Sequence, residues 1–348
     1  MLLFETAQKL SQLPAVSGRE CLAHEELKEL CGDLFDEYRF TPTGSVIAIK
    51  RCGKPDAKKV MLDAHLDEVG FLVKDIAENG FLKIVNVGGI DTAILSAAEV
   101  WVLGSEKILG VFTSKPPHLQ TAGESEKKPK LSDLAIDTGL PTDKLKEIAP
   151  IGTPVAYKCE VSRMIGNRIC GKSFDDRICM LAIMQAVEYL KDAELDCDIY
   201  ALFASGEETG YVGAMTGAFE IDPDYAIALD VCNAYVDGAD NMFKARKMGA
   251  GCAISYSATT CRELTTNIID TAKKNNIPYQ VIAEPSRTGT DAHIHQLVRA
   301  GIPGALISIP LYNMHTYNEI IDLDDVDNTA KLLTEFIKGG SLKVNFQT

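Results

Sequence analysis

The sequence predicts an α/β fold in which a mostly parallel sheet is flanked by helices and interrupted by a small, β-rich inserted domain. Three observations predict it. Short apolar runs recur along the chain, and segments of helical length separate them. Residues 70–160 instead contain short β-like pieces separated by glycine, proline and charged residues. The chain has 348 residues. That length is enough for about two domains with sizeable cores.

The apolar runs are typical of strands that are buried on both faces of a parallel sheet. They cover residues 60–66, 197–204, 225–231 and 305–310. Segments of helical length lie at residues 177–195, 261–276 and 291–300. In the first of these segments the apolar side chains fall mainly on one side, so that side is expected to pack on the sheet. The ligand site of such a fold lies beyond the carboxyl ends of the strands.

The middle of the chain contains short β-like pieces separated by glycine, proline and charged residues. We expect residues 70–160 to form the inserted domain, and residues 1–69 and 161–348 to form the domain that carries the chemistry. Val100, Trp101 and Val102 are expected in the core of the inserted domain. The polar run at residues 123–130 has no apolar period and is expected to be a solvated loop.

The composition excludes several classes of protein. Asp and Glu number 49 against 35 Lys and Arg, so the formal net charge is −14, which disfavours binding to nucleic acid or to an anionic membrane. No apolar run reaches about 18 residues, so no membrane span is expected. The N-terminal stretch also lacks the basic start of a signal peptide. The ten cysteines form no C-x-x-C pair, which indicates reduced thiols and a cytoplasmic protein.

Acidic residues and histidines occur where the apolar runs end. His65 and Asp67 close one run, and residues two apart in a strand face the same way. This arrangement suits a metal ligand beside a group that orients it, but a buried histidine bonded to a carboxylate would look the same. Asp175 and Asp176 precede a helix. They either cap that helix or bind metal, with one carboxylate bridging two ions.

Three further strand ends carry similar residues. Glu207 and Glu208 are adjacent and would repel each other unless a cation or a shared proton relieved them, although a solvated loop also explains them. Asp230 closes an apolar run, where a lone carboxylate is costly unless it is paired or bound to metal. His315 follows the last run, with Glu319 four residues further on.

These residues together supply two imidazoles and three carboxylates. That is the number needed for two metal ions about 3.5–4 Å apart that share one carboxylate. The candidate ligands are His65, Asp175, Glu208, Asp230 and His315. Imidazole with carboxylate favours Zn²⁺, Co²⁺ or Mn²⁺ over Ca²⁺ or Mg²⁺. Helix capping explains such residues at successive strand ends poorly, so the pattern favours a dinuclear centre.

Eight stretches of the sequence are recognisable. They read LDAHLDEVGFLV, GGID, SKPPHL, GKSFDDR, SGEETGYVGA, ALDV, GTDA and ISIPLYNMH. In this order and at this spacing they resemble the glutamyl and tetrahedral aminopeptidases of metallopeptidase family 42, over essentially the whole chain. The resemblance implies a zinc-exopeptidase-like catalytic domain with an inserted β-domain used for dimerisation. It also implies dimers that build a hollow tetrahedral dodecamer.

The resemblance further implies a role for each candidate ligand. Asp175 would bridge two divalent ions, either Zn²⁺ or Co²⁺, with Mn²⁺ as a third candidate. His65 and Asp230 would complete the site of one ion. Glu208 and His315 would complete the site of the other.

The remaining roles concern the reaction, which would remove the N-terminal residue of a peptide. Glu207 would be the general base that activates a water between the ions, and Asp67 would hydrogen-bond His65. Thr290 and Asp291, within the stretch GTDA, are expected to help line the substrate pocket.

Other interpretations remain open. A dinuclear deacylase or carboxypeptidase would use the same metal ligands, and a glycoside hydrolase would use two carboxylates as acid and base. A non-catalytic shell protein would keep the fold alone. His293 and His295 resemble a metal pair, but residues two apart on a helix point to different sides, so we expect neither to be a ligand.

Overall fold

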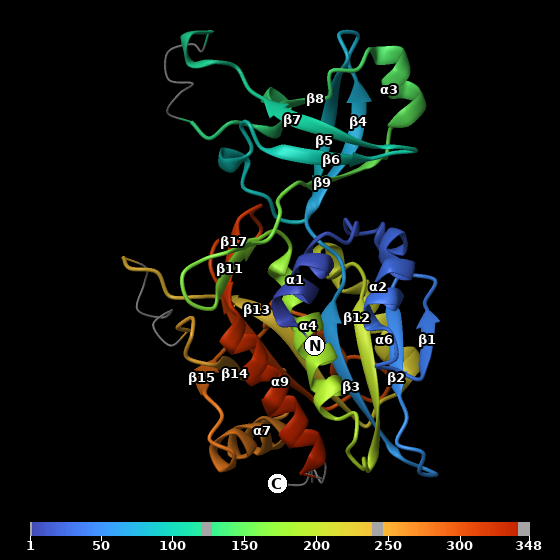
Figure 1. The fold of residues 1–348 in the computed structure, drawn as a ribbon, viewed down its shortest axis with the longest axis vertical. Coiled ribbons are helices and arrows are strands. Elements are labelled where there is room, and N and C mark those ends of the chain that lie inside the picture. Colours follow the sequence, from blue (N-terminus) through green and yellow to red (C-terminus); the bar gives the residue numbers. More distant parts are fainter. Residues whose placement is uncertain (1, 120–126, 239–245, 340–348) are drawn as a thin grey trace.

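The computed structural model describes residues 2–119, 127–238 and 246–339. An eight-stranded sheet with helices on both faces forms the larger part, and a closed barrel of six strands lies beyond one end of it (Figure 1). The predicted α/β class, with a mostly parallel main sheet and a second β-rich part, is confirmed. No helix in the described ranges combines the length and the apolar character that a membrane crossing needs.

The main sheet has the strand order β1-β2-β12-β3-β13-β16-β14-β15. Its four central strands, β12, β3, β13 and β16, run parallel, so their carboxyl ends meet at one edge. The strands are β1 (Glu37–Phe40), β2 (Val46–Lys50), β3 (Lys58–His65), β12 (Cys197–Ala204), β13 (Tyr225–Asn233), β14 (Cys252–Tyr256), β15 (Tyr279–Ala283) and β16 (Gly304–Leu311).

Helices cover both faces of this sheet. One face packs against α1 (Leu3–Ser11), α2 (His24–Cys31), α4 (Phe174–Tyr189), α7 (Arg262–Lys274) and α9 (Leu323–Lys338). The other face packs against α6 (Val212–Ile221) and α8 (Ala292–His295). The short elements η1 (Glu20–Ala23) and α5 (Glu207–Gly210) lie near the edge where the parallel strands end, because the Gly206 amide donates to Glu20 and the Glu207 amide donates to Asp67. The central strands are therefore buried on both sides, as their continuous apolar runs predict.

The barrel has its own apolar core, separate from that of the main sheet. Its strands follow the order β4-β5-β8-β7-β6-β9, and a small sheet β10-β11-β17 lies where the barrel joins the larger part (Figure 1). The elements are β4 (Gly70–Ile76), β5 (Phe81–Val87), η2 (Thr92–Ile94), β6 (Glu99–Leu103), β7 (Lys107–Thr113), η3 (Pro117–Leu119), η4 (Leu131–Asp133), β8 (Ala135–Asp137), α3 (Thr142–Ile148), β9 (Pro154–Tyr157), β10 (Ser162–Arg163), β11 (Arg168–Gly171) and β17 (Glu319–Asp322).

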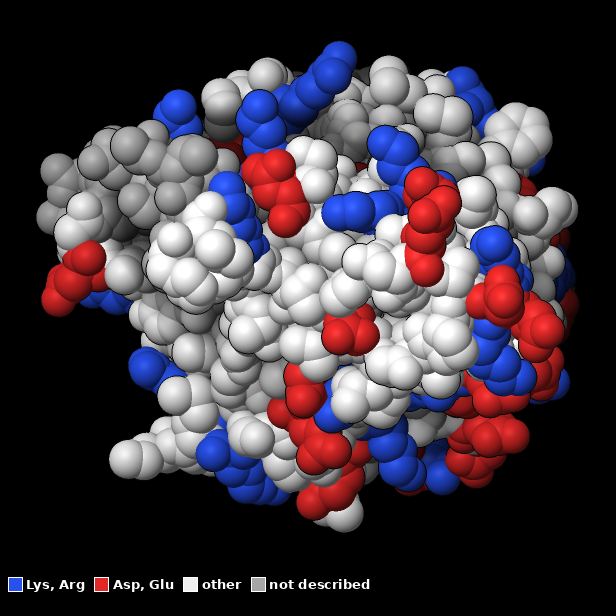
Figure 2. All heavy atoms as spheres, turned by 90° about the horizontal axis from the view of Figure 1, so that it is seen from above, with Lys and Arg blue, Asp and Glu red and all other residues white. Residues whose placement is uncertain are grey.

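The surface at the barrel end mixes acidic and basic side chains among uncharged ones (Figure 2). On this face the described residues form no continuous basic surface of the kind that nucleic acid needs.

Three local expectations are wrong. The helix expected over residues 291–300 is a single turn, because Arg299 and Gly301 adopt left-handed backbone and the Ile302 amide folds back onto the His295 carbonyl. The helix expected to reach residue 195 ends at residue 189. Trp101 is only half-buried, because side chains alternate along β6 and its two valine neighbours take the inward positions.

The polar run at residues 123–130 lies partly outside the described residues. In its described part, Lys127, Lys128 and Lys130 are exposed.

Candidate metal centre

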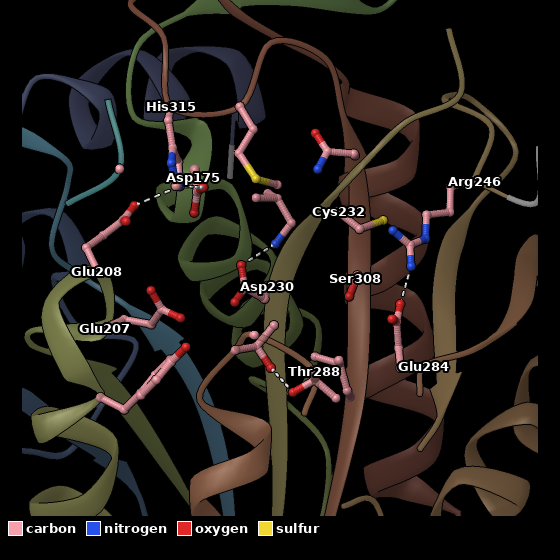
Figure 3. Close-up of a pocket in the computed structure, with 18 residues that line it drawn as sticks. Asp175, Glu207, Glu208, Asp230, Cys232, Arg246, Glu284, Thr288, Ser308 and His315 are labelled. Carbon is pink, nitrogen blue, oxygen red and sulfur yellow. Dashed lines mark hydrogen bonds and ion pairs between the residues drawn. The ribbon is translucent and has the colours of Figure 1, made fainter. Parts of the chain in front are cut away.

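The candidate ligands meet at the edge where the parallel strands end, on the side of the barrel. Figure 3 shows four of them, namely Asp175, Glu208, Asp230 and His315. His65 is the last residue of β3, and Asp230 lies close to the end of β13. Glu207 and Glu208 open α5, just after β12, and His315 follows β16. Side chains from four parallel strands are therefore brought to one place by the order of those strands.

Asp175 approaches from the start of α4. Asp175 and Asp176 do not have helical dihedral angles, so the regular helix begins at Arg177. Their carboxylates have different surroundings. Asp175 lines the cavity at the sheet edge, whereas the fully buried Asp176 accepts a hydrogen bond from the His65 main-chain amide at 3.2 Å.

Asp175 belongs to two groups of ligand atoms. In one group, the ligand atoms of His65, Asp175 and Asp230 all lie within 4.8 Å of one another. The ligand atoms of Asp175, Glu208 and His315 form a second group of the same size. His65 Nε2 lies 3.0 Å from Asp175 Oδ1, and His315 Nε2 lies 3.2 Å from Asp175 Oδ2. Each carboxylate oxygen thus faces a different imidazole, which is the arrangement that a bridging carboxylate requires.

The two adjacent glutamates are oriented through their main chain. Asp67 Oδ1 accepts a hydrogen bond from the Glu207 amide at 3.0 Å, and Asp67 Oδ2 accepts one from the Glu208 amide at 3.2 Å. The preceding Gly206 has φ +65°, a left-handed conformation that favours glycine. Its amide donates to Glu20 Oε1 at 2.9 Å. Two buried carboxylates therefore hold the turn that presents the glutamates.

Other contacts orient the histidines. His65 Nδ1 lies 3.0 Å from the main-chain oxygen of Asp67 and 3.5 Å from its carboxylate, so the carbonyl is the nearer partner. Glu319 connects the other side of the centre. Its carboxylate accepts hydrogen bonds from the amides of Asp175 at 3.1 Å and His315 at 2.8 Å.

The electrostatics of the centre favour a cation. Burial, with repulsion from Asp230, raises the pKa of Glu207 to about 11. Burial and the charge of Asp175 likewise raise the pKa of Asp230 well above its usual range. Burial also acts on Asp175, but hydrogen bonds from His315 and His65 outweigh it and lower the pKa of this carboxyl. Crowded, buried carboxylates beside two imidazoles fit divalent metal ions, which would offset the repulsion.

The centre opens into a cavity of about 410 Å³. Beyond the candidate ligands, the cavity reaches Arg246 and Glu284 at its far side (Figure 3). The further lining residues are Gly89, Glu207, Tyr211, Val231, Cys232, Asn233, Thr288, Gly289, Thr290, Leu306, Ser308 and Met314.

The stretch GTDA and the two histidines after it lie beside this cavity. Thr290 lines it. Asp291 is 4% exposed, and neither of its carboxylate oxygens has a hydrogen-bond partner among the described residues. His293 Nδ1 contacts the Thr290 carbonyl at 2.7 Å, and His295 Nε2 contacts Asp63 at 2.7 Å. Neither histidine joins a candidate ligand group formed by the described residues.

Four residues of the site were not assigned a role from the sequence. Glu319 had a usable signal, because it stands four residues after His315. Glu20 looks like an ordinary surface position, yet it is 2% exposed. Arg246 and Glu284 are 38 residues apart (284 − 246), and no local pattern connects them.

Comparisons with known proteins show which family this chain is similar to. The sequence model of the M42 glutamyl aminopeptidase family matches residues 44–332. The lysyl aminopeptidase of Pyrococcus furiosus is 33% identical over 338 residues, which cover 95% of this chain and 96% of the relative.

Solved structures are similar over nearly the whole chain. An aminopeptidase from the archaeon Desulfurococcus kamchatkensis is 30% identical, with a TM-score of 0.90 and 99% of each chain covered. The TET1 peptidase of Pyrococcus horikoshii can assemble into a tetrahedron or a large octahedral shell. It is 27% identical, with a TM-score of 0.84, covering 96% of this chain and 99% of that chain. A Thermotoga maritima structure named as an endoglucanase is 29% identical, with a TM-score of 0.76 and 97% of each chain covered.

The family match spans most of the chain, and the relatives align from end to end. The chain therefore belongs to the M42 glutamyl aminopeptidase family and is a metal-dependent aminopeptidase.

Proposed function

We propose that this aminopeptidase removes the N-terminal residue of peptides with two divalent metal ions and a carboxylate general base. The observation that carries the proposal is the Asp175 carboxylate, which is common to two groups of ligand atoms. His65 and Asp230 would complete the site of one ion. Glu208 and His315 would complete the site of the other.

Glu207 is the proposed general base. When bound, the ions supply Lewis-acid polarisation of the scissile carbonyl and acidify the attacking water. Glu207 lines the cavity and would take the proton of that water, then return it to the leaving amine. The positive charge beside it would lower its raised pKa and so keep it ionised. Asp67 would keep Glu207 in place through the main-chain amide.

The acidic lining of the cavity supports a substrate with a free amino terminus. Glu207 lines the cavity and is not a proposed metal ligand, so its negative charge favours an α-ammonium group over a neutral acyl group. An N-acetylated substrate lacks that charge. Trimming would therefore proceed from the N-terminus.

Metal identity, assembly and location are further parts of the proposal. Two imidazoles with three carboxylates favour Zn²⁺ or Co²⁺, with Mn²⁺ as a third candidate. We propose that residues 70–160 are an inserted dimerisation domain between residues 1–69 and 161–348, and that dimers build a tetrahedral dodecamer. The separate barrel core and the assemblies named for the Pyrococcus horikoshii relative support this. All ten cysteines are free, which supports a cytoplasmic protein.

Release of a chromogenic amine from aminoacyl anilides tests the reaction. Cleavage should require added Co²⁺ or Zn²⁺, stop with chelator, and fail on N-acetylated substrates. Glu207→Gln should keep both ions, measured by elemental analysis, and lose nearly all turnover. Glu220→Gln, an exposed carboxylate at the end of α6, is the matched control and should stay active.

Other outcomes would identify the alternatives. Turnover retained by metal-loaded Glu207→Gln would refute its role as base. Cleavage of acylated or C-terminal residues would indicate a deacylase or carboxypeptidase. Chelator-resistant hydrolysis of a glucan would favour a glycoside hydrolase, and no turnover with both ions bound would favour a non-catalytic shell protein.

A further inference from the structure

The cavity extends from the candidate metal centre across one face of the main sheet. Asp230 of β13 lies opposite Ser308 of β16, and Ser308 lies opposite Ala253 of β14. Cys232, two residues after Asp230, points to the same side. These side chains are small, and neighbouring strands are roughly 5 Å apart. The floor beside the centre therefore has room for the side chain of a substrate residue.

An ion pair bounds the cavity on its far side. The Arg246 guanidinium donates to the Glu284 carboxylate, and both residues line the cavity (Figure 3). Their side chains are only 14% and 18% exposed. The Arg246 main-chain oxygen accepts a hydrogen bond from the Tyr235 amide, just after β13, and the Glu284 amide donates to the Tyr256 oxygen at the end of β14. Both residues are therefore held near the carboxyl ends of these strands, where the opposite charges meet. Water screens the pair less than it would at an exposed position.

This wall is unfavourable for a charged substrate side chain. A substrate carboxylate would share Arg246 with Glu284, so two negative charges would face one positive charge. A substrate ammonium group would likewise add a second positive charge beside Arg246. A largely buried net charge without compensation is strongly destabilising.

A side-chain amide suits the same wall. Its carbonyl oxygen can accept from Arg246 while its NH₂ group donates to Glu284, so the ion pair stays intact. The hydroxyls of Ser308 and Thr288 also line the cavity and can add hydrogen bonds.

We propose that Arg246 and Glu284 determine specificity, and that this pocket selects N-terminal residues with an uncharged amide side chain, glutamine above all. The inference rests on the proposed aminopeptidase reaction and deepens it. The relatives do not provide the preference, since one is named for lysine and the family for glutamate.

The test compares kcat/KM of the metal-loaded enzyme for anilides of Gln, Glu, Lys and Leu. Gln and Glu have nearly the same shape and differ in charge, so their ratio isolates electrostatic recognition. We expect Gln to exceed each of the other three at least tenfold.

Two substitutions should shift the ranking in opposite directions. Glu284→Gln removes the negative charge that pairs with Arg246, so a substrate carboxylate can take its place, and should raise the Glu/Gln ratio at least tenfold. Arg246→Gln should instead raise the Lys/Gln ratio at least tenfold. Glu284→Asp keeps the pair and should keep the ranking. Glu37→Gln removes a carboxylate of β1 that pairs with Arg39 and Arg51. Because β1 is the strand at the opposite edge of the main sheet, this control should change neither ratio.

The outcomes separate this inference from the proposed function. A wild-type preference for Glu, Lys or Leu over Gln would overturn the inference, as would a Glu284→Gln variant that slows all substrates equally. If Arg246→Gln fails to fold, Glu284→Gln and Glu284→Asp still decide the matter. Absence of cleavage with both ions bound would overturn the proposed function and the inference with it.

Discussion

Glu20 provides a test of how burial acts on the turn beside the active site. Its side chain is 2% exposed, and Oε1 accepts hydrogen bonds at 2.9 Å from the amides of Gly18 and Gly206. Burial, followed by the charge of Asp67, raises the pKa of this carboxyl from 4.5 to about 7. The substitution Glu20→Gln keeps an acceptor oxygen and removes the ionisation.

The sign of the effect follows from proton binding. Between pH 4.5 and about 7 the folded state retains a proton that the unfolded chain has lost. The free energy of unfolding therefore falls as pH rises through this range and stays level above it. The difference between the two pKa values corresponds to about 3 kcal/mol. Glu20→Gln should exceed the wild type by less than about 1 kcal/mol at pH 5 and by about 3 kcal/mol at pH 8.

Urea unfolding at pH 5, 6, 7 and 8, with both proteins in the same metal-saturated buffer, measures this difference. Glu37→Gln is the control, because hydrogen bonds from Arg39 and Arg51 lower the pKa of that carboxyl. This control should be less stable than the wild type, by an amount that hardly changes from pH 6 to pH 8. A Glu20→Gln difference that is the same at every pH would refute the reasoning.

Three further substitutions test the centre and its support. Asp175→Asn should lose both ions and all activity, and elemental analysis showing two ions retained would contradict the shared carboxylate. In Asp67→Asn a single carbonyl oxygen replaces the two carboxylate oxygens that accept hydrogen bonds from the Glu207 and Glu208 amides. We expect kcat/KM to fall about 10–100-fold with metal still bound. Gly213→Ala would place a Cβ 2.2 Å from the Ser205 main-chain nitrogen. That variant should be recovered mainly as insoluble protein, and a wild-type melting temperature would disprove the close approach.

The sequence predicted the parallel sheet and the candidate ligands because both leave local signals. A strand buried on both faces is a continuous apolar run, and a carboxylate or imidazole at its end is conspicuous. His65 and Asp230 stand at such ends. Parallel neighbours place their carboxyl ends at one edge, so the location of the site at that edge follows from the pattern.

The errors arose where the local signal was weak. The apolar residues at 291–300 fit a helix, but the chain turns back after one turn, at Arg299 and Gly301. Trp101 is a large apolar residue and is therefore expected in the core. Side chains alternate along β6, however, so Trp101 points outward, and Lys107 Nζ lies 4.6 Å from the centroid of its ring. In both places neighbouring structure overrides residue type.

The sequence by itself determined the class of fold, the family and the residues at the strand ends, because apolar periodicity and short motifs are local properties of the chain. The tertiary structure alone decided that Glu20 holds the turn of Gly206, and that Arg246 meets Glu284 on the far side of the cavity. These contacts join residues far apart in the chain. They depend on the order of the strands and on how far burial excludes water from the side chains. A local sequence pattern determines neither.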